Sequence, residues 1–285
     1  MRGNGRSGDA PPAPQPLAAP TVDAHCHLDL MEVDVATALA QARTVGIERV
    51  VSIGIDVPTS QWQVDAAAAH DDVFAAVAIH PNEVHAATDD DFAAIARLAT
   101  HPRVVAIGET GLDHFRTAAD GWKQQEESFR RHIAIAKEND KALVIHDRDA
   151  HDDVLRVLEE EGAPERVVFH CFSGDAEFAR ACADRGYVMS FAGNVTFNNA
   201  QPLRDAAAAA PLELLLVETD APFLTPMPYR GRPNAPYLVP ITVRAIAEVR
   251  GVAPDEIAVA TGANARRIFA FEPQKSQGQQ PRHNV

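Results

Sequence analysis

The chain has 285 residues, of which 46% are hydrophobic and 23% are charged, and this composition is typical of a globular protein with a sizeable core. Its formal net charge of −14 argues against broad electrostatic adhesion to nucleic acid. No apolar run approaches the roughly 20 residues of a membrane helix, and the N-terminal stretch lacks the apolar centre of a secretory signal.

The two ends of the chain have the composition of disordered tails. Residues 1–20 are rich in Gly, Pro and Ala, and residues 272–285 are rich in Gln and other polar residues. Residues 21–271 contain no linker-like break, so we expect one folded domain there. Eight short apolar runs in this domain are predicted to be strands. They span Thr21–Ala24, Arg49–Ile55, Val73–Ile79, Val104–Gly108, Ala142–Ile145, Val167–Phe169, Tyr187–Phe191 and Leu212–Val217.

Most of the gaps between these runs have apolar residues at a helical period. In the first gap, Val35, Ala38, Leu39 and Ala42 recur at a spacing near 3.6. Eight apolar strands with crossover helices in about 250 residues predict a parallel (β/α)8 barrel, a TIM-like fold of the α/β class. A doubly wound open sheet is the alternative, but no GxGxxG motif follows the first strand. Three more helices are expected to close the chain, at Tyr237–Val249, Pro254–Thr261 and Gly262–Phe269.

Residues with metal-ligand chemistry stand at the ends of five predicted strands, where barrels of this kind have their active sites. They are His25, His27, Glu109, His146, His170 and Asp220. A single histidine at a strand end is commonly structural. Six ligand-type residues at five strand ends instead predict a metal centre.

We expect this set to bind two divalent cations. Residues two apart on an extended chain face the same side, so the HxH pair can reach one ion. Four histidines and two carboxylates exceed the needs of one tetrahedral ion, and they suit Zn, Mn or Mg. In the predicted arrangement His25 and His27 bind one ion, His146 and His170 bind the other, Glu109 bridges both, and Asp220 contacts the first ion and takes the proton from the attacking water.

The same segments resemble the signature motifs of the TatD family of metal-dependent hydrolases. The motifs are VDAHCHLD at 22–29, IHP at 79–81, GETGLD at 108–113, QExxF at 125–129, VIH at 144–146, FHCFSG at 169–174, ETDAP at 218–222 and Asn264-Ala265. They span the whole predicted domain in the family's order. The resemblance implies a TIM-like barrel, divalent-metal dependence, deoxyribonuclease activity and the same six ligands.

The resemblance also indicates substrate contacts. His80 belongs to the His-Pro motif and is expected to face the pocket, as a substrate contact, as a ligand or as a structural histidine. Ser173 begins a turn that either presents N–H groups to a phosphate or only connects a strand to a helix. The family's basic segment after Pro222 corresponds here to Arg230 and Arg232, which suit phosphate.

The sequence departs from the family's pattern at two places. Pro233 stiffens the loop that follows Arg232 and can change the direction of its side chain. His114 stands where the family commonly has an aromatic residue, with Phe115 after it. His114 is therefore either an extra substrate contact or an exposed loop histidine.

We expect a metal-dependent hydrolase that cleaves phosphodiester bonds in DNA or small oligonucleotides. The metal ions would supply the positive potential that the acidic surface lacks. A hydrolase of a small ester, amide, lactone or aminoacyl-tRNA bond is one alternative, and a non-enzymatic binding barrel is another. Three scattered cysteines without a CxxC pair favour reduced thiols and a cytoplasmic location. No membrane or obligate protein partner is expected.

Overall fold

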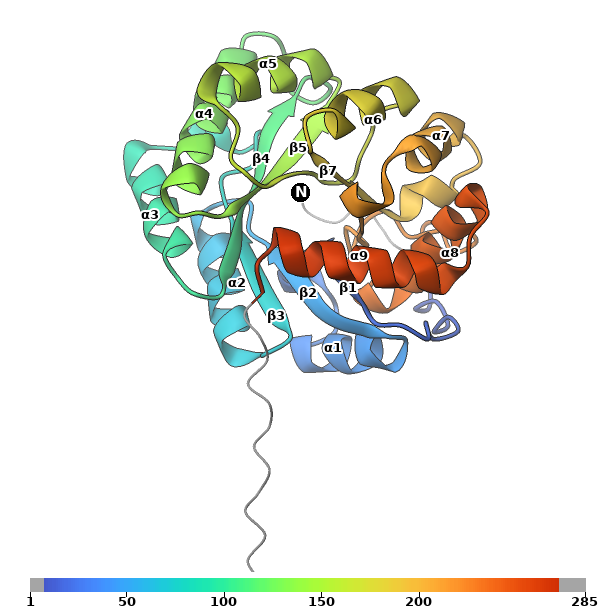
Figure 1. Ribbon diagram of the computed structural model, residues 1–285. Helices are drawn as coiled ribbons and strands as arrows, with labels where there is room; N and C mark the ends of the chain where they lie inside the picture. Colours follow the sequence, from blue (N-terminus) through green and yellow to red (C-terminus); the bar gives the residue numbers. More distant parts are fainter. Residues whose placement is uncertain (1–7, 272–285) are drawn as a thin grey trace, which may run out of the picture.

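The computed structural model describes residues 8–271, and within this range eight parallel strands alternate with helices around a nearly closed barrel (Figure 1). The predicted TIM-like fold is confirmed. The strands follow one another in chain order around the sheet. They are β1 (Thr21–Cys26), β2 (Ile47–Ile53), β3 (Val73–Val77), β4 (Val104–Asp113), β5 (Ala142–Arg148), β6 (Val167–Phe169), β7 (Val188–Phe191) and β8 (Leu215–Val217).

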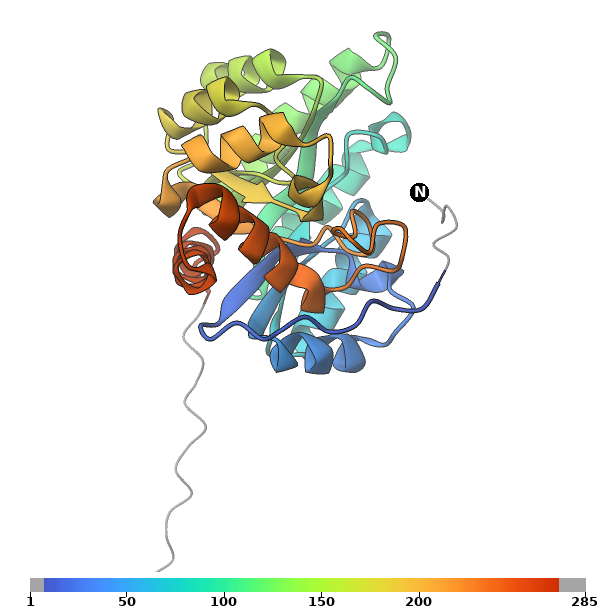
Figure 2. The same cartoon turned by 90° about the vertical axis from the view of Figure 1, so that its right-hand side faces the viewer.

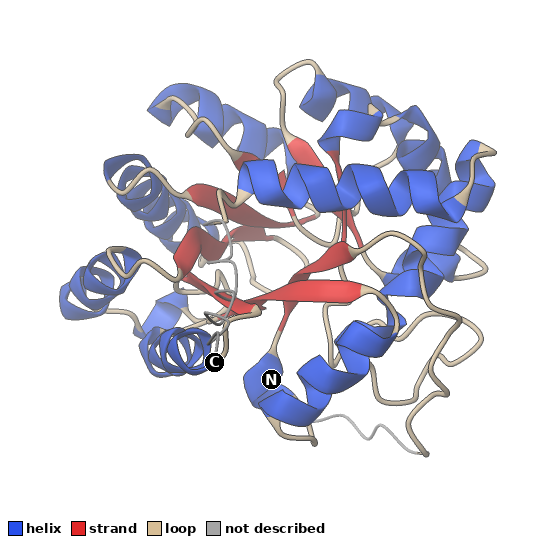
Figure 3. Ribbon diagram, turned by 60° about the horizontal axis from the view of Figure 1, so that its bottom comes forward, coloured by secondary structure: helices blue, strands red, loops and turns tan. Residues whose placement is uncertain are grey.

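Helices surround the barrel in an outer layer (Figure 3). Within residues 8–271 the α-helices are α1 (Val35–Thr44), α2 (Val57–Ala69), α3 (Asp89–Ala99), α4 (Trp122–Glu138), α5 (His151–Glu161), α6 (Ala176–Ala183), α7 (Gln201–Ala209), α8 (Val239–Arg250) and α9 (Pro254–Ile268). Short 3-10 turns are η1 (Leu28–Leu30), η2 (Val84–Ala86), η3 (Gly193–Thr196), η4 (Leu212–Leu214) and η5 (Pro236–Leu238). Among the described residues, no helix combines the length and apolarity that crossing a membrane requires.

Alternation along the strands divides the barrel interior into an apolar floor and a polar rim. On β5, Ala142 and Val144 belong to the inner apolar cluster, and His146 continues the same face two residues later. On β8, Leu216 lies in this cluster, and Glu218, two residues later, faces the same side of the chain. The C-terminal ends of the strands therefore gather polar groups above a dry core.

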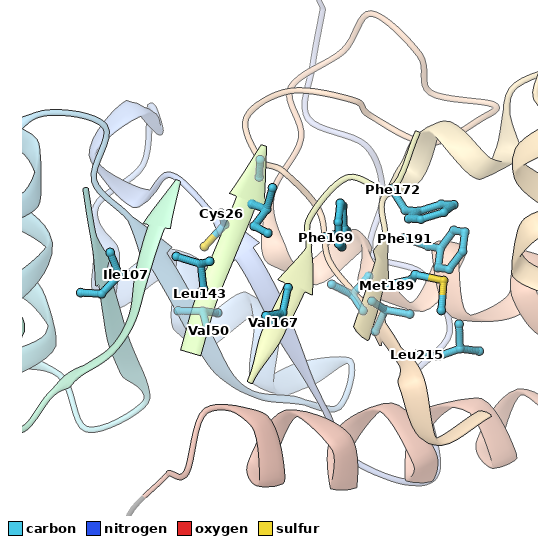
Figure 4. Packing of buried hydrophobic residues seen from close by; sticks show 14 of the residues in the cluster. Cys26, Val50, Ile107, Leu143, Val167, Phe169, Phe172, Met189, Phe191 and Leu215 are labelled. Atoms are coloured by element: carbon cyan, nitrogen blue, oxygen red, sulfur yellow. The ribbon is translucent and has the colours of Figure 1, made fainter. Parts of the chain in front are cut away.

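The other faces of the strands pack against the surrounding helices. Leu143 and Val167 belong to this outer cluster, together with the aromatic rings of Phe169 and Phe191 (Figure 4). All four side chains are almost completely buried. Burying such a side chain contributes about 1.5–3 kcal/mol relative to leaving it in water, so this layer fixes the strand positions that the rim depends on.

Within the described residues, two helices follow the last strand's loop where three were predicted. The predicted break at Gly262 is wrong, because α9 continues through this residue to Ile268. A Cβ at Gly262 would lie 2.9 Å from the carbonyl oxygen of Pro20. Glycine is therefore needed for the close approach of α9 to the start of β1, and the helix then places Ile268 against the inner apolar cluster.

The barrel closes weakly between β1 and β8. One isolated parallel bridge, between Cys26 and Ala221, joins the two sides. Beside it, the N–H of His27 donates to the carbonyl of Ala221 at 2.7 Å, and the N–H of Asp220 donates to the carbonyl of His25 at 2.9 Å. These bonds lie at the polar rim, so closure and site formation involve the same residues.

Residues 8–20 differ from the predicted disordered tail, since they run along the outside of the barrel beside α1 (Figure 2). Leu17 is buried and its N–H donates to the carbonyl of Val45. The Tyr237 hydroxyl donates to the carbonyl of Pro11 at 2.7 Å, and Arg244 donates to that of Gln15. A proline-rich segment loses little chain entropy when it docks in an extended form, which composition alone does not reveal. Residues 1–7 and the predicted tail at 272–285 lie outside the described residues.

Candidate metal centre

The structure brings all six predicted ligands together at the C-terminal rim, around a cavity of about 490 Å³. His27, Glu109, His146, His170 and Asp220 line this cavity, and His25 lies beneath it, fully buried. Three groups have ligand atoms close enough to share a cation. They are His25 with His27 and Asp220, His25 with Glu109 and His170, and His80 with Glu109 and His146.

The first half of the centre comes from β1 and the end of β8, and we call it the β1/β8 half (His25, His27 and Asp220). The Nδ1 of His27 lies 3.1 Å from the carbonyl oxygen of Ile53, to which it donates. Its Nε2 therefore keeps a lone pair, and it faces Asp220 Oδ1 at 3.6 Å. Asp220 has a left-handed backbone (φ 52°), which aspartate tolerates better than most residues.

His25 is the least satisfied residue of this half. Among the described residues neither of its buried ring nitrogens has a hydrogen-bond partner. Burial and the neighbouring imidazole of His170, stacked 3.8 Å away, lower the pKa of His25 well below its usual value. His25 is therefore neutral and presents a lone pair to the space that Glu109 and Asp220 also face.

The second half, which we call the β4–β6 half, consists of Glu109, His146 and His170. Glu109 Oε1 lies 2.6 Å from His146 Nδ1 and 2.7 Å from His170 Nε2. Burial would raise the pKa of Glu109, but the surrounding imidazoles hold it well below the usual range. Burial opposes a charge on His170 as well, yet the Glu109 carboxylate raises the pKa of this imidazole well above its usual value.

Two further buried carboxylates orient the histidines of the β4–β6 half. Asp113 Oδ2 lies 3.2 Å from His146 Nε2, and Glu218 Oε1 lies 3.3 Å from His170 Nδ1. Such partners fix the ring orientation and increase the basicity of a ligating imidazole. Gly111, between Glu109 and Asp113, allows this approach because a Cβ there would lie 2.2 Å from the His146 carbonyl oxygen.

His80 lies at the same rim, as expected, but its hydrogen bonds give it a different character. The N–H of Asn82 donates to His80 Nδ1 at 3.0 Å. Burial also lowers the pKa of His80, so the ring is neutral and its remaining proton is on Nε2. This Nε2 lies 3.3 Å from Glu109 Oε1. His80 is thus a hydrogen-bond donor into the cavity in this arrangement.

Divalent cations fit these residues. The neutral ring of His25 has one nitrogen with a lone pair that needs an electrophilic partner, and the β1/β8 half supplies no proton donor for it. Imidazole and carboxylate together suit Zn, Mn and related ions. The sequence assigned His146 and His170 to the same ion; in the structure His170 is grouped with His25 and Glu109, and His146 with His80 and Glu109.

Of the remaining predicted substrate contacts, Ser173 lies at the cavity, whereas Arg230 and Arg232 lie away from it. Ser173 lines the cavity, and its hydroxyl donates to the carbonyl of Asp147 at 3.0 Å. Arg230 stacks on Phe197 instead, with its guanidinium carbon 4.4 Å from the ring centre. Arg232 donates to the carbonyls of Asp9 and Ala10 in the N-terminal segment. Neither arginine is among the described residues that line the cavity.

Several residues of the cavity wall were not singled out from the sequence. Arg116, Asp147, Arg148, Asn194 and Leu224 all line it. Strand periodicity offered a signal for Arg148, which is two residues after His146 on β5. The loop residues gave no such signal, because their positions depend on how the chain turns after each strand. His114, left open from the sequence, stacks on Trp122 at 3.8 Å.

A parallel barrel with imidazoles and carboxylates at its C-terminal rim is the framework of a metal-dependent hydrolase. Comparison with known families matches residues 22–270 to the model described as TatD related DNase. The chain belongs to the TatD family of metal-dependent hydrolases. It is 46% identical over 258 residues to the uncharacterized metal-dependent hydrolase TatD of Mycobacterium tuberculosis, covering 88% of this chain and 98% of the relative.

Other relatives agree. The uncharacterized metal-dependent hydrolase YabD of Bacillus subtilis is 40% identical over 256 residues, covering 87% of this chain and 98% of that protein. Among solved structures, the TatD homologue YjjV of Escherichia coli superposes with a TM-score of 0.83 at 27% identity, covering 88% of this chain and 98% of that one. A phosphotriesterase homology protein of Escherichia coli, at 15% identity and a TM-score of 0.63, shares the fold.

Proposed function

We propose that this protein is a deoxyribonuclease that cleaves phosphodiester bonds with two divalent cations. The observation that supports this most is the convergence of six ligand-type residues on one cavity, around the buried and unpaired imidazole of His25. The description of the matching family model, TatD related DNase, points to the same substrate.

Each half of the centre has a distinct task in this proposal. Bound divalent cations would supply Lewis-acid stabilisation of the phosphoryl group and would acidify the attacking water. His25, His27, His146 and His170 would hold the cations, with Glu109 between the two halves. Asp220, on the more open side of the centre, would accept the proton of the water.

A cytoplasmic location remains a prediction from the cysteines.

His80 and Ser173 would contact the substrate. His80 lines the cavity, and an imidazole N–H there can stabilise charge on a phosphoryl oxygen. Single-stranded ends and short oligonucleotides suit the site better than long duplex. A cavity of about 490 Å³ is small compared with a DNA duplex. The net charge of −14 also disfavours binding of a long polyanion.

The proposal is tested by chelation and by comparing substrates. We expect protein treated with chelator to lose hydrolysis of a single-stranded DNA oligonucleotide and to regain it with Mg²⁺, Mn²⁺ or Zn²⁺. His25→Ala should not be rescued at the same metal concentration. Parallel assays with RNA and with carboxylic esters show whether DNA is preferred. Hydrolysis that persists after chelation and in His25→Ala would overturn the mechanism, and a clear preference for esters would overturn the substrate.

A further inference from the structure

An exposed aromatic ring packs against an arginine of the cavity wall. Phe115, in the loop after β4, is 63% exposed, more than the other large hydrophobic residues that are exposed in the described chain. The guanidinium carbon of Arg148 lies 3.9 Å from the centre of its ring. A planar cation stacked on one aromatic face stabilises the ring's position while most of its surface remains open to solvent.

Arg148 joins this ring to the metal centre. It is the last residue of β5 and follows His146 by two positions, so both side chains leave the strand on the same side. Arg148 lines the cavity together with His146 and Ser173. The Phe115–Arg148 pair therefore joins a residue of the cavity wall to an exposed ring, and we call it the stacking ledge.

The loop that bears Phe115 is rigidly tied to the same centre. Asp113 Oδ1 accepts the N–H groups of Phe115 at 3.1 Å and of Arg116 at 2.8 Å, while Oδ2 faces His146. The next residue after Asp113, His114, stacks on Trp122 of α4. One carboxylate thus sets the position of a candidate ligand and of the ledge together.

We propose that the stacking ledge binds the nucleotide next to the scissile phosphodiester, with the base on Phe115 and the adjoining phosphate at Arg148. This rests on the proposed nuclease function. Every nucleobase has a π-face, so an aromatic platform binds unpaired bases with little sequence preference. The metal centre would hold the scissile phosphodiester. The guanidinium of Arg148 at the cavity wall would bind the neighbouring phosphate of the same strand. The ledge requires an unstacked base, so it selects single strands.

The test separates the ledge from the metal chemistry by using two substrates. Phe115→Ala should raise the KM for a single-stranded trinucleotide by roughly 5-fold to 100-fold, the usual worth of one base stack. The KM for the same trinucleotide with an abasic site in place of the base next to the scissile bond should stay within about twofold of the wild-type value. Phe115→Trp should keep the trinucleotide KM, and Phe115→Leu should not.

Arg148 has its own signature. Arg148→Gln should raise the KM for the trinucleotide and reduce the slope of log KM against log salt by about 0.7, the value for one phosphate contact to a single strand. Arg148→Lys should restore the salt slope but only part of the affinity, because its ammonium does not stack on the ring. Trp62→Ala, which removes an aromatic ring of 38% exposure that does not line the cavity, is the matched control.

A binding measurement keeps the two proposals distinguishable. A trinucleotide that contains 2-aminopurine should lose fluorescence when its base stacks on the ledge of the chelated wild-type protein, and Phe115→Ala should abolish this quenching. Quenching without hydrolysis of either substrate would retain the ledge and overturn the nuclease. Equal trinucleotide KM values for Phe115→Ala, Trp62→Ala and wild type, with normal hydrolysis, would overturn the ledge and retain the nuclease.

Discussion

The two halves of the centre are satisfied in different ways. In the β4–β6 half, the two imidazoles have a carboxylate at each ring nitrogen, Glu109 on one side and Asp113 or Glu218 on the other. In the β1/β8 half, the ring nitrogens of His25 have no hydrogen-bond partner within residues 8–271, and the ring of His27 has a backbone carbonyl and a carboxylate 3.6 Å away. In the β4–β6 half, carboxylate side chains provide a partner for each ring nitrogen. In the β1/β8 half, a bound cation would have to provide the missing partner.

This difference indicates what each half contributes. Hydrogen bonds hold the β4–β6 half in place before any cation binds, so it is preorganised. The β1/β8 half contains a neutral imidazole in a dry environment, an arrangement that costs free energy without a partner. Metal affinity is therefore expected to depend on both halves. Of the two, only the β4–β6 half is expected to contribute to the stability of the chelated protein.

The largest effect is expected at the residue between the halves. Glu109→Gln removes the negative charge that faces His25, His80, His146 and His170 but keeps the size of the side chain. We expect kcat/KM for DNA to fall by at least about 1,000-fold, or roughly 4 kcal/mol of transition-state stabilisation. Glu83→Gln, at the wall of the same cavity, should change kcat/KM by less than about threefold. Comparable losses in both variants would show that cavity charge in general matters, and not the bridging position.

Equivalent apolar substitutions in the two halves should have unequal effects on stability. In chelator, His170→Leu leaves Glu109 and Glu218 each without one partner and should cost roughly 1–3 kcal/mol of unfolding free energy. His25→Leu removes a buried group whose nitrogens are unpaired, so the unfolding free energy should stay equal or rise. Urea unfolding measures both. An equal loss in the two variants would contradict the comparison.

A carboxylate on the helical surface, outside the metal centre, gives a reference for the size of these effects. Glu126 on α4 pairs with Arg156 and Arg130, both at 2.7 Å, and these arginines lower its pKa to about 2. Its folded pKa is below its unfolded value, so the stabilisation is present above about pH 4.5 and is lost as the pH falls towards 2. Because water reaches this pair, Glu126→Gln should cost only about 1 kcal/mol at pH 7, and less at high salt. Thermal unfolding across this pH range checks both statements, and a loss that persists at pH 2.5 would point to packing instead of charge.

The fold and the convergence of the six residues were predictable because they follow from periodicity. Apolar strands with crossover helices permit few topologies, and the C-terminal ends of parallel strands meet at one rim. His146 and His170 lie where alternation along β5 and β6 places them. His25 is a partial exception. The pairing of β1 with β2 shifts between Asp23 and Cys26, and this irregularity turns His25 to the same side as Val22 and Ala24.

The remaining features depend on contacts that no local pattern encodes. Arg230 and Arg232 belong to a long loop, and their direction is set by Phe197 and by residues 9–10, which are distant in sequence. The predicted division into two helices at Gly262 was wrong, because this glycine serves close packing against Pro20 inside one continuous helix. Arg148 followed the alternation rule and was missed because arginine at a strand end is also a common solvent-facing residue.

The single bridge between β1 and β8 gives the centre a mechanical consequence. His25 and His27 stand on one side of this seam and Asp220 on the other, so a cation that they share would span the line along which the barrel closes. Its binding free energy would then also be closure free energy. Slow opening of the barrel in the loaded protein would have to break coordination bonds, which would link the lifetime of the closed barrel to the residence time of the ion.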